Sequence, residues 1–485
     1  MKKNKQQISK IQKELLEQQP KKETFEKLHG KPVTRRDFLA SGLIGFSSSL
    51  VLPTFLTTFA RSGVAEAEEM ICKASGGGDL CPFISIKLSG GMAMSANFLP
   101  MDQGGQLLPS YSKLGMGLGA TLPVSYEFAN KASFYANSSL LAGIRAEAST
   151  LTLGNSNFVG VCVRSQDDSN GNKFDITGLV VNSGLSGKIL PNLGKANTDT
   201  GVNNQFAYLR PPAPLVVGSY QDVVGSLGVS GSLASLSQNQ KSQLFKTIQN
   251  LTSAQSAAIQ NMTGGSLLAR LLGCAHSDNT NLIANNMSLN IDPLSNTQFA
   301  QVWGINANSN KSSQDFVFAT MVYNALNGNA SSVNLEIGGF DYHNNTRTSG
   351  DAKDLEAGTV IGRVLQSLAV MGKKGFVVVT SDGSVTSTES DTAGAPWASD
   401  RGTGGSAYMM CYDPAGPHTV KSGQLGHFTS GQVADDAFLT GSSAELAAGA
   451  MFVNYLSFNK KLNLVDSLLP RVFSTSDIDL ITKIV

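Results

Sequence analysis

The chain has 485 residues, 41% of them hydrophobic, which is enough apolar material for one large domain or two ordinary ones. Its 37 basic and 36 acidic residues nearly cancel, and none of its five cysteines forms a C-x-x-C pair, so neither a structural zinc nor a redox motif is indicated. Beyond residue 67 the sequence lacks the P-loop, the dinucleotide-binding glycine fingerprint, the Gly-x-Ser-x-Gly elbow and the His-Glu-x-x-His helix, which disfavours those enzyme classes.

The N-terminus has the layout of an export signal. Nine lysines crowd the first 31 residues, and an uncharged run extends from Phe38 to Ala60. Between them, the paired Arg35 and Arg36 are followed after one residue by Phe-Leu, which matches the twin-arginine signal that bacterial exporters of folded proteins recognise. The sequence therefore predicts a twin-arginine translocase as partner and a periplasmic, cell-surface or secreted location.

A cleavage site is predicted at Ala65-Glu66-Ala67, which gives a signal region of residues 1–67 and a single mature domain of residues 68–485. An uncleaved anchor is the alternative, although serines, glycines and Pro53 interrupt the apolar run more than is usual in a membrane helix. Cleavage removes 12 of the 37 basic and 6 of the 36 acidic residues, which leaves 25 and 30 and a net charge of −5. Nucleic acid is therefore not an expected partner.

The first half of the mature chain predicts strands and helices in alternation. Residues 82–88 alternate apolar and polar and end at Gly90-Gly91, which indicates a strand that runs into a tight turn. A helical pattern between Phe128 and Ser149 surrounds Leu140 and Ile144, and residues 158–163 form a buried strand. The polar segment 226–296 keeps apolar residues at helical spacing, so it is predicted to be a helical insertion rather than a linker.

Two local features allow more than one interpretation. Cys72 and Cys81 flank a glycine-rich turn and could form a disulfide in an oxidising compartment. Asp168, Asn170 and Asn172 imitate the start of a calcium loop, but Lys173 occupies the position that requires glycine, which favours a plain turn rich in Asp and Asn.

The clearest pattern lies in the second half. Strands at 333–339 and 375–380 enclose a helix at 355–371, a β-α-β unit whose strands should be parallel and should end at one crevice. Asp341 and His343 follow the first strand, and Asp382 follows the second. Carboxylate and imidazole at strand ends can hold a divalent metal such as zinc.

Plainer interpretations of these residues stay open. Asp341 is equally suited to capping the next helix or turn, and His343 to an exposed loop. His418 and His427 lie in later loops and are further candidate ligands, although such histidines are more often surface residues.

Four short motifs carry a family resemblance. They are Leu88-Ser89-Gly90-Gly91-Met92-Ala93-Met94, Gly339-Phe340-Asp341-Tyr342-His343, Val379-Thr380-Ser381-Asp382-Gly383-Ser384 and Asp400-Arg401-Gly402. In these motifs the chain resembles an exported bacterial family, domain of unknown function 1501, which is related to the alkaline phosphatase and sulfatase superfamily. The resemblance implies an alkaline-phosphatase-like α/β fold, with a mixed, mainly parallel sheet flanked by helices. It also implies metal-facing roles for Asp341, His343, Asp382 and Asp400.

Three positions depart from the family and superfamily motifs. Ala93 stands where the family has a metal-binding aspartate, Gly383 where alkaline phosphatases have histidine, and Arg401 where the family has histidine. Hydrolysis in this superfamily uses two cations, so the resemblance implies an exported protein with a partly degenerate metal site and little or no hydrolase activity. That protein would act by binding, or as part of the cell envelope.

The alternative function is a metal-dependent hydrolase of phosphate or sulfate esters. Its donors do not distinguish zinc, calcium and manganese, and its nucleophile is not identified by the sequence. Arg401 could bind an anion with its guanidinium in place of a metal, or be an exposed loop residue.

Overall fold

The computed structural model describes residues 80–112, 116–117, 119–164, 175–186, 192–194, 215–227, parts of 236–250, 290–340, 347–381 and 405–485. All of them belong to one compact unit, residues 51–485. The predicted signal region, with Arg35 and Arg36, lies outside the described residues, and so does Cys72.

Within these residues, eight strands form one mainly parallel sheet. The order across the sheet is β10-β4-β9-β8-β1-β7-β5-β6, and β9 alone runs antiparallel to its neighbours β4 and β8. The strands are β1 (Phe83–Ser89), β4 (Ser156–Val163), β5 (Asn192–Gly194), β6 (Leu215–Val216), β7 (Ser332–Gly338), β8 (Gly375–Ser381), β9 (Gly405–Tyr412) and β10 (Gln424–Leu425). The predicted mixed, mainly parallel α/β sheet is confirmed at this level.

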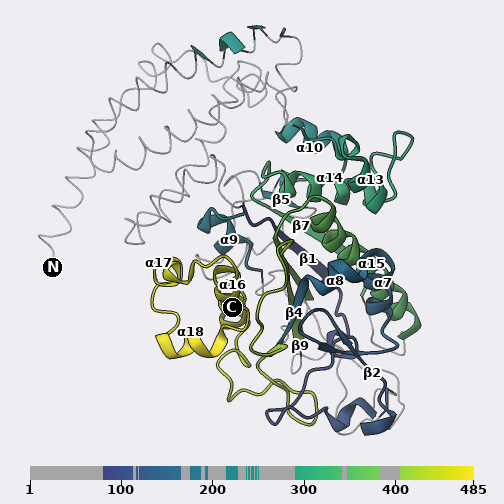
Figure 1. Ribbon diagram of the computed structural model, residues 1–485, viewed down its shortest axis with the longest axis vertical. Helices are drawn as coiled ribbons and strands as arrows, with labels where there is room; N and C mark the ends of the chain where they lie inside the picture. Colours follow the sequence, from purple (N-terminus) through teal and green to yellow (C-terminus); the bar gives the residue numbers. More distant parts are fainter. Residues whose placement is uncertain are drawn as a thin grey trace, which may run out of the picture. The chain divides into compact units, whose positions relative to one another are not determined.

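Helices cover both faces of the sheet (Figure 1). The first core packs α7 (Ser139–Glu147), α8 (Thr150–Gly154), α13 (Thr297–Val302), α14 (Gln314–Leu326) and α15 (Arg347–Val370) against one face. The second core packs α9 (Thr177–Ser183), α16 (Ala444–Phe458), α17 (Val465–Leu468) and α18 (Thr475–Ile481) against the other. Helix α10 (Tyr220–Leu227) contacts α14. Short 3-10 helices are η2 (Met94–Ala96), η3 (Pro109–Ser112), η4 (Gly119–Thr121), η6 (Pro293–Ser295) and η7 (Leu462–Leu464).

The predicted β-α-β unit is present, with one addition. Strands β7 and β8 and helix α15 lie at the expected places, although α15 begins at Arg347, eight residues before the predicted start. Both strands are parallel to β1, which lies between them and pairs with each. The expectation that the two strands are parallel is confirmed, and the structure places a third strand end between theirs.

The helix predicted around Leu140 and Ile144 is present as α7, but the part of the predicted region before it, from Phe128 to Ser138, is not helical. It contains the turn and second strand of an antiparallel hairpin, β2 (Val124–Glu127) and β3 (Ala132–Tyr135), before α7. Phe128 and Lys131 adopt positive φ in the hairpin turn, which is incompatible with a helix. The helix begins only after Ser138, whose side chain accepts a hydrogen bond from the Leu141 N–H.

Helices α7 and α15 touch backbone to backbone. Gly143 on α7 faces Gly358 on α15, and a Cβ atom added at Gly358 would lie 2.0 Å from the Leu140 carbonyl oxygen. Glycine at the contact lets the two helix axes approach more closely than larger side chains allow. This contact fixes α15, which leads from β7 to β8.

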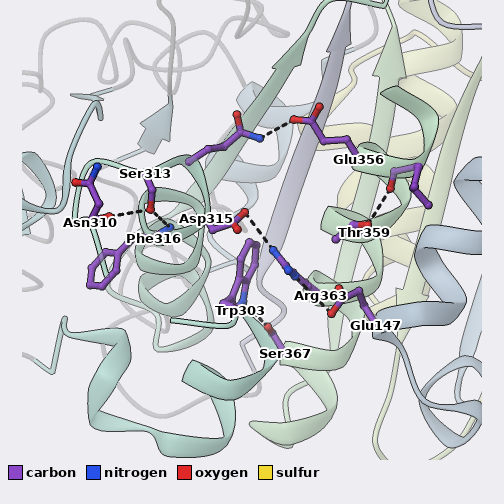
Figure 2. A network of polar contacts seen from close by, with 12 residues as sticks. Glu147, Trp303, Asn310, Ser313, Asp315, Phe316, Glu356, Thr359, Arg363 and Ser367 are labelled. Atoms are coloured by element: carbon purple, nitrogen blue, oxygen red, sulfur yellow. Dashed lines mark hydrogen bonds and ion pairs between the residues drawn. The ribbon is translucent and has the colours of Figure 1, made fainter. Parts of the chain in front are cut away.

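A polar network ties the outer side of α15 to its neighbours (Figure 2). Arg363 lies 3.1 Å from Asp315 of α14 and 3.4 Å from Glu147 of α7. The Trp303 indole N–H donates to the Ser367 hydroxyl over 2.9 Å. Partly exposed ion pairs contribute about 0–1 kcal/mol each, so this network orients helices that are held mainly by their apolar faces.

The predicted insertion at 226–296 is described only in part. Helix α10 ends at Leu227, several positions between 239 and 250 are helical, and residues 251–289 lie outside the described part of the chain. No helix among the described residues combines the length and the apolar character needed to span a bilayer.

Candidate functional site

Three strand ends meet at the centre of the sheet. Ser89 pairs with Gly338, and Leu88 pairs with Ser381, so the carboxyl ends of β7 and β8 lie on either side of the end of β1. Parallel strands of an open sheet commonly place ligand sites beyond these ends. We call this place the strand-end site.

The acidic and basic residues predicted for this site lie outside the described part of the chain. They are Asp341, His343, Asp382, Asp400 and Arg401, together with Gly383. Asp341 directly follows Phe340, the last described residue after β7, and Asp382 directly follows Ser381, the last residue of β8. The strands that lead to these two carboxylates therefore end on the two sides of β1.

A tight turn after β1 joins the three ends. Gly90 has a φ of +110°, and a Cβ atom there would lie 2.3 Å from the Phe340 carbonyl oxygen. The Phe340 N–H donates to the Ser89 carbonyl oxygen at 3.1 Å. The Met92 N–H donates to the Ser381 hydroxyl, which itself donates to the Leu88 carbonyl oxygen, each over 2.9 Å. The turn predicted at Gly90-Gly91 is confirmed.

Ala93, which the sequence resemblance places opposite a metal-binding aspartate, is apolar and buried. Ala93 is 1% exposed, and Met92 and Met94 on either side of it are fully buried. A second metal would need an oxygen, nitrogen or sulfur donor here, and a methyl group supplies none. The segment after β1 therefore does not fit the two-metal arrangement.

A buried polar network that the sequence interpretation missed holds this same segment. Asn97 donates its side-chain amide to the Asp354 carboxylate over 2.8 Å and to the Ala93 carbonyl oxygen over 3.3 Å. The Ser138 hydroxyl donates to the Asn97 amide oxygen over 2.5 Å. Asp354 is 1% exposed and belongs to α15. Asp354 lies three residues before the buried Ala357, so it is an acidic residue on the apolar stripe of α15. An acid in such a position is the sequence signal that could have identified this network.

A buried phenol lies next to this network. Burial, reinforced by the Asp354 carboxylate, raises the pKa of Tyr408 well above its usual range. The Tyr408 hydroxyl donates a hydrogen bond to the Met94 carbonyl oxygen. Asp354, Asn97 and Tyr408 thus fix the backbone that follows β1.

Polar side chains line the opposite face of the central strands. Lys87 of β1 is 4% exposed and pairs in register with Glu336 of β7 and Thr380 of β8. The Ser89 hydroxyl donates to the Glu336 carboxylate over 3.0 Å, and the Thr177 hydroxyl of α9 donates to the Asn334 side chain over 3.2 Å. Buried polar and charged groups are costly unless they are paired, so their concentration beside the strand ends indicates a functional surface.

Asp175 adds a titratable carboxyl to this face. Burial raises its pKa to about 6, against the hydrogen bonds from Thr177 and the charge of Lys87, which lower it. Its Oδ1 atom accepts the Thr177 N–H at 2.7 Å, and its Oδ2 atom has no hydrogen-bond partner among the described residues. A carboxyl with this pKa gains and loses a proton near neutral pH, which is the property required of a general acid or base.

The two later histidines do not approach the strand-end site. The backbone of His418 exchanges hydrogen bonds with the side chain of Asn157, near the amino-terminal start of β4, so it lies at the opposite end of the sheet. His427 follows β10, three positions from β8 in the sheet, about 14 Å at ordinary strand spacing. Both rings bond aspartates, His418 to Asp413 at 3.0 Å and His427 to Asp435 at 2.7 Å.

The side chains of the described residues do not form a ligand group of the kind that holds metal ions. No group of three or more His, Cys, Asp or Glu side chains is placed to hold a metal within the described residues. Cys81, Cys162 and Cys411 are buried free thiols, and burial raises the pKa of Cys81 to about 12.

Comparisons of this chain with family models, with curated proteins and with solved structures found no match.

Proposed function

We propose that this chain is an exported protein of alkaline-phosphatase-like or sulfatase-like fold that has lost most of its hydrolase activity and acts by binding. The observation that carries the proposal is the buried Ala93, four residues after the end of β1 and between two buried methionines. Two-metal hydrolysis stabilises the attacking and the leaving oxygen with separate cations, and the loss of one site removes much of that stabilisation.

The donors that remain suffice for one divalent cation. Asp341, His343, Asp382 and Asp400 supply oxygen and nitrogen atoms that suit zinc, calcium or manganese to different degrees. The mainly parallel sheet supports this part of the proposal, because β7 and β8 end on either side of β1. Arg401 would add a positive charge opposite an anionic group of the ligand.

Metal analysis and two ester substrates test the proposal. We expect the purified mature chain to hold at most one divalent cation and to hydrolyse neither p-nitrophenyl phosphate nor p-nitrophenyl sulfate above background. Asp341→Ala should remove any bound metal, whereas Asp466→Ala, an exposed acid on α17, should leave it unchanged. Turnover that is lost with the metal in Asp341→Ala would overturn the proposal.

That outcome would support the second candidate function, a metal-dependent hydrolase of phosphate or sulfate esters. It is favoured by the register of the central strands, since the residues just before Asp341 and Asp382 flank one strand end. Lys87 and Asp175, which are both buried, would then act near the reaction as charge stabiliser and proton carrier.

Export is tested separately from chemistry. We propose that the twin-arginine translocase carries the folded chain out of the cytoplasm, with residues 1–67 as its signal. Replacing Arg35 and Arg36 together by lysine should trap the protein in the cytoplasm, whereas replacing Lys21 and Lys22 together by glutamine should not. Equal export of both variants would contradict the assignment. Mass spectrometry of the exported chain would show whether cleavage follows Ala67.

A further inference from the structure

A cavity lies away from the strand-end site, along the edge strand β10. It has a volume of about 340 Å³, and its wall comes from five parts of the chain: the loop 98–105, the β2–β3 turn with the start of β3, the residues around β10, Phe438, and the C-terminal segment at Lys483. A volume of this size is at the lower end of the range for small-molecule sites. We call this cavity the edge pocket.

Two lysines from distant parts of the chain line the edge pocket. They are Lys131 in the hairpin turn and Lys483 near the C-terminus. Neither forms an ion pair with a described residue. Partial burial, together with the neighbouring charge of Lys421, lowers the pKa of Lys483. An anion in the pocket would relieve both the desolvation and the repulsion.

The hairpin turn holds Lys131 in a strained but well-anchored conformation. Lys131 has a φ of +56°, which is uncommon for a residue with a side chain. The preceding residue, Asn130, donates its amide to the Phe158 carbonyl oxygen over 2.8 Å and accepts the Phe158 N–H over 3.0 Å. Strain that the surroundings hold in place is typical of functional positions.

The opposite wall is equally fixed. The Gln424 side chain accepts the Met101 N–H over 2.8 Å and donates to the Met101 carbonyl oxygen over 3.0 Å, so it serves as a strand partner for the loop. Phe98, Leu99 and Phe438 give the pocket an apolar part.

The acidic side chains in and near the edge pocket already have hydrogen-bond partners. Asp102 lines the pocket, and its carboxylate accepts the Gln106 N–H over 2.8 Å. His427 also lines the pocket, and its ring is bonded to Asp435. Two ammonium groups against one lining carboxylate leave the pocket positively charged, and its apolar part suits a hydrocarbon body.

We propose that the edge pocket binds a small organic anion, a carboxylate or sulfonate on an apolar body, with Lys131 and Lys483 recognising the charged oxygens. The assignment is independent of the proposed function, because the ligand contains no ester bond and the pocket lies three strand positions from β8.

Binding of benzoate and benzenesulfonate, with benzamide as the uncharged analogue of benzoate, tests this. Measured by ligand-observed NMR and calorimetry on the purified mature chain, both acids should bind and benzamide should bind at least ten-fold more weakly. Lys131→Gln and Lys483→Gln should each lower the affinity for benzoate roughly ten-fold, which corresponds to about 1.4 kcal/mol of binding free energy. Lys373→Gln, an exposed lysine before β8, should bind benzoate as the unchanged chain does.

Lys131 is exposed, so its replacement is expected to leave folding intact. Lys131→Gln therefore tests the proposal even if the Lys483→Gln variant does not fold. Benzamide binding equal to that of benzoate would overturn the proposal. So would unchanged affinity in Lys131→Gln, or failure of both acids to bind. None of these results depends on metal or on ester hydrolysis at the strand-end site.

Discussion

The two sides of β1 carry different kinds of side chain, although both sides are largely buried. On the side of α7 and α15 the strand presents only apolar residues, Ile84, Ile86 and Leu88, all fully buried. On the side of α9 it begins with Phe83 and continues with Ser85, Lys87 and Ser89. Strand β7 repeats the contrast, with Val333, Leu335 and Ile337 on one side and Asn334 and Glu336 on the other.

Solvent exposure does not explain the polar side, because Lys87 and Ser85 are buried. A central parallel strand covered on both faces usually presents apolar residues to both. The alternation in β1 would be ordinary for a strand with one wet face, whereas in this position it places charge inside the protein beside three strand ends. The apolar side is therefore built for stability, and we interpret the polar side as the functional one.

The largest expected effect comes from a substitution in the helices that cover the apolar side of β1. Gly358→Ala should lower the free energy of unfolding by about 3 kcal/mol, because the new Cβ atom would meet the Leu140 backbone and force α7 and α15 apart. Urea denaturation measures this. The matched control is Gly225→Ala in α10, where a Cβ atom meets nothing within 4 Å and helix propensity should add up to about 1 kcal/mol. Equal stability of the two variants would refute the close helix contact.

A second prediction concerns the polar side and its dependence on pH. The pKa of Asp175 is about 6 in the folded chain against an ordinary 3.8. The folded chain thus holds this proton more tightly than the unfolded chain. The contribution of Asp175 is present in full below pH 4 and is lost as the pH rises through 6. Compared with Asp175→Asn, the unchanged chain should lose about 2 to 3 kcal/mol between pH 4 and pH 7.

Unfolding curves at several pH values measure that difference. Asp435→Asn is the control of opposite sign. The hydrogen bond from the Ala437 N–H and the contact with His427 lower the pKa of Asp435, so its contribution is lost as the pH falls. Parallel stability profiles of Asp175→Asn and the unchanged chain would show that the Asp175 carboxyl is not perturbed.

The sequence predicted the sheet better than the site. The regular apolar periodicity of residues 333–380 identified β7, α15 and β8, because local patterning decides such elements. Neither the insertion of β1 between β7 and β8 nor the pairing of Asp354 with Asn97 could be predicted, since both join residues more than 240 positions apart. The hairpin before α7 was missed because Phe128 and Lys131 occupy positive φ without being glycine. The residues chosen for the metal lie outside the described part of the chain and stay predictions.

The smallest expected effect comes from replacing Ser381, the polar last residue of β8, which lies on the apolar side of the sheet. Val377 and Val379 face the first core, and Ser381 follows them in alternation. Its hydroxyl accepts the Met92 N–H and donates to Leu88, so Ser381→Ala leaves a buried N–H without its partner. We expect a loss of about 1 to 2 kcal/mol, against nearly none for Thr359→Ala, whose exposed hydroxyl only bonds the Leu355 carbonyl oxygen within its own helix. If Ser381→Ala also weakens metal retention by the chain, the joined strand ends hold the donor loops in place; if stability alone falls, the hydroxyl serves the fold.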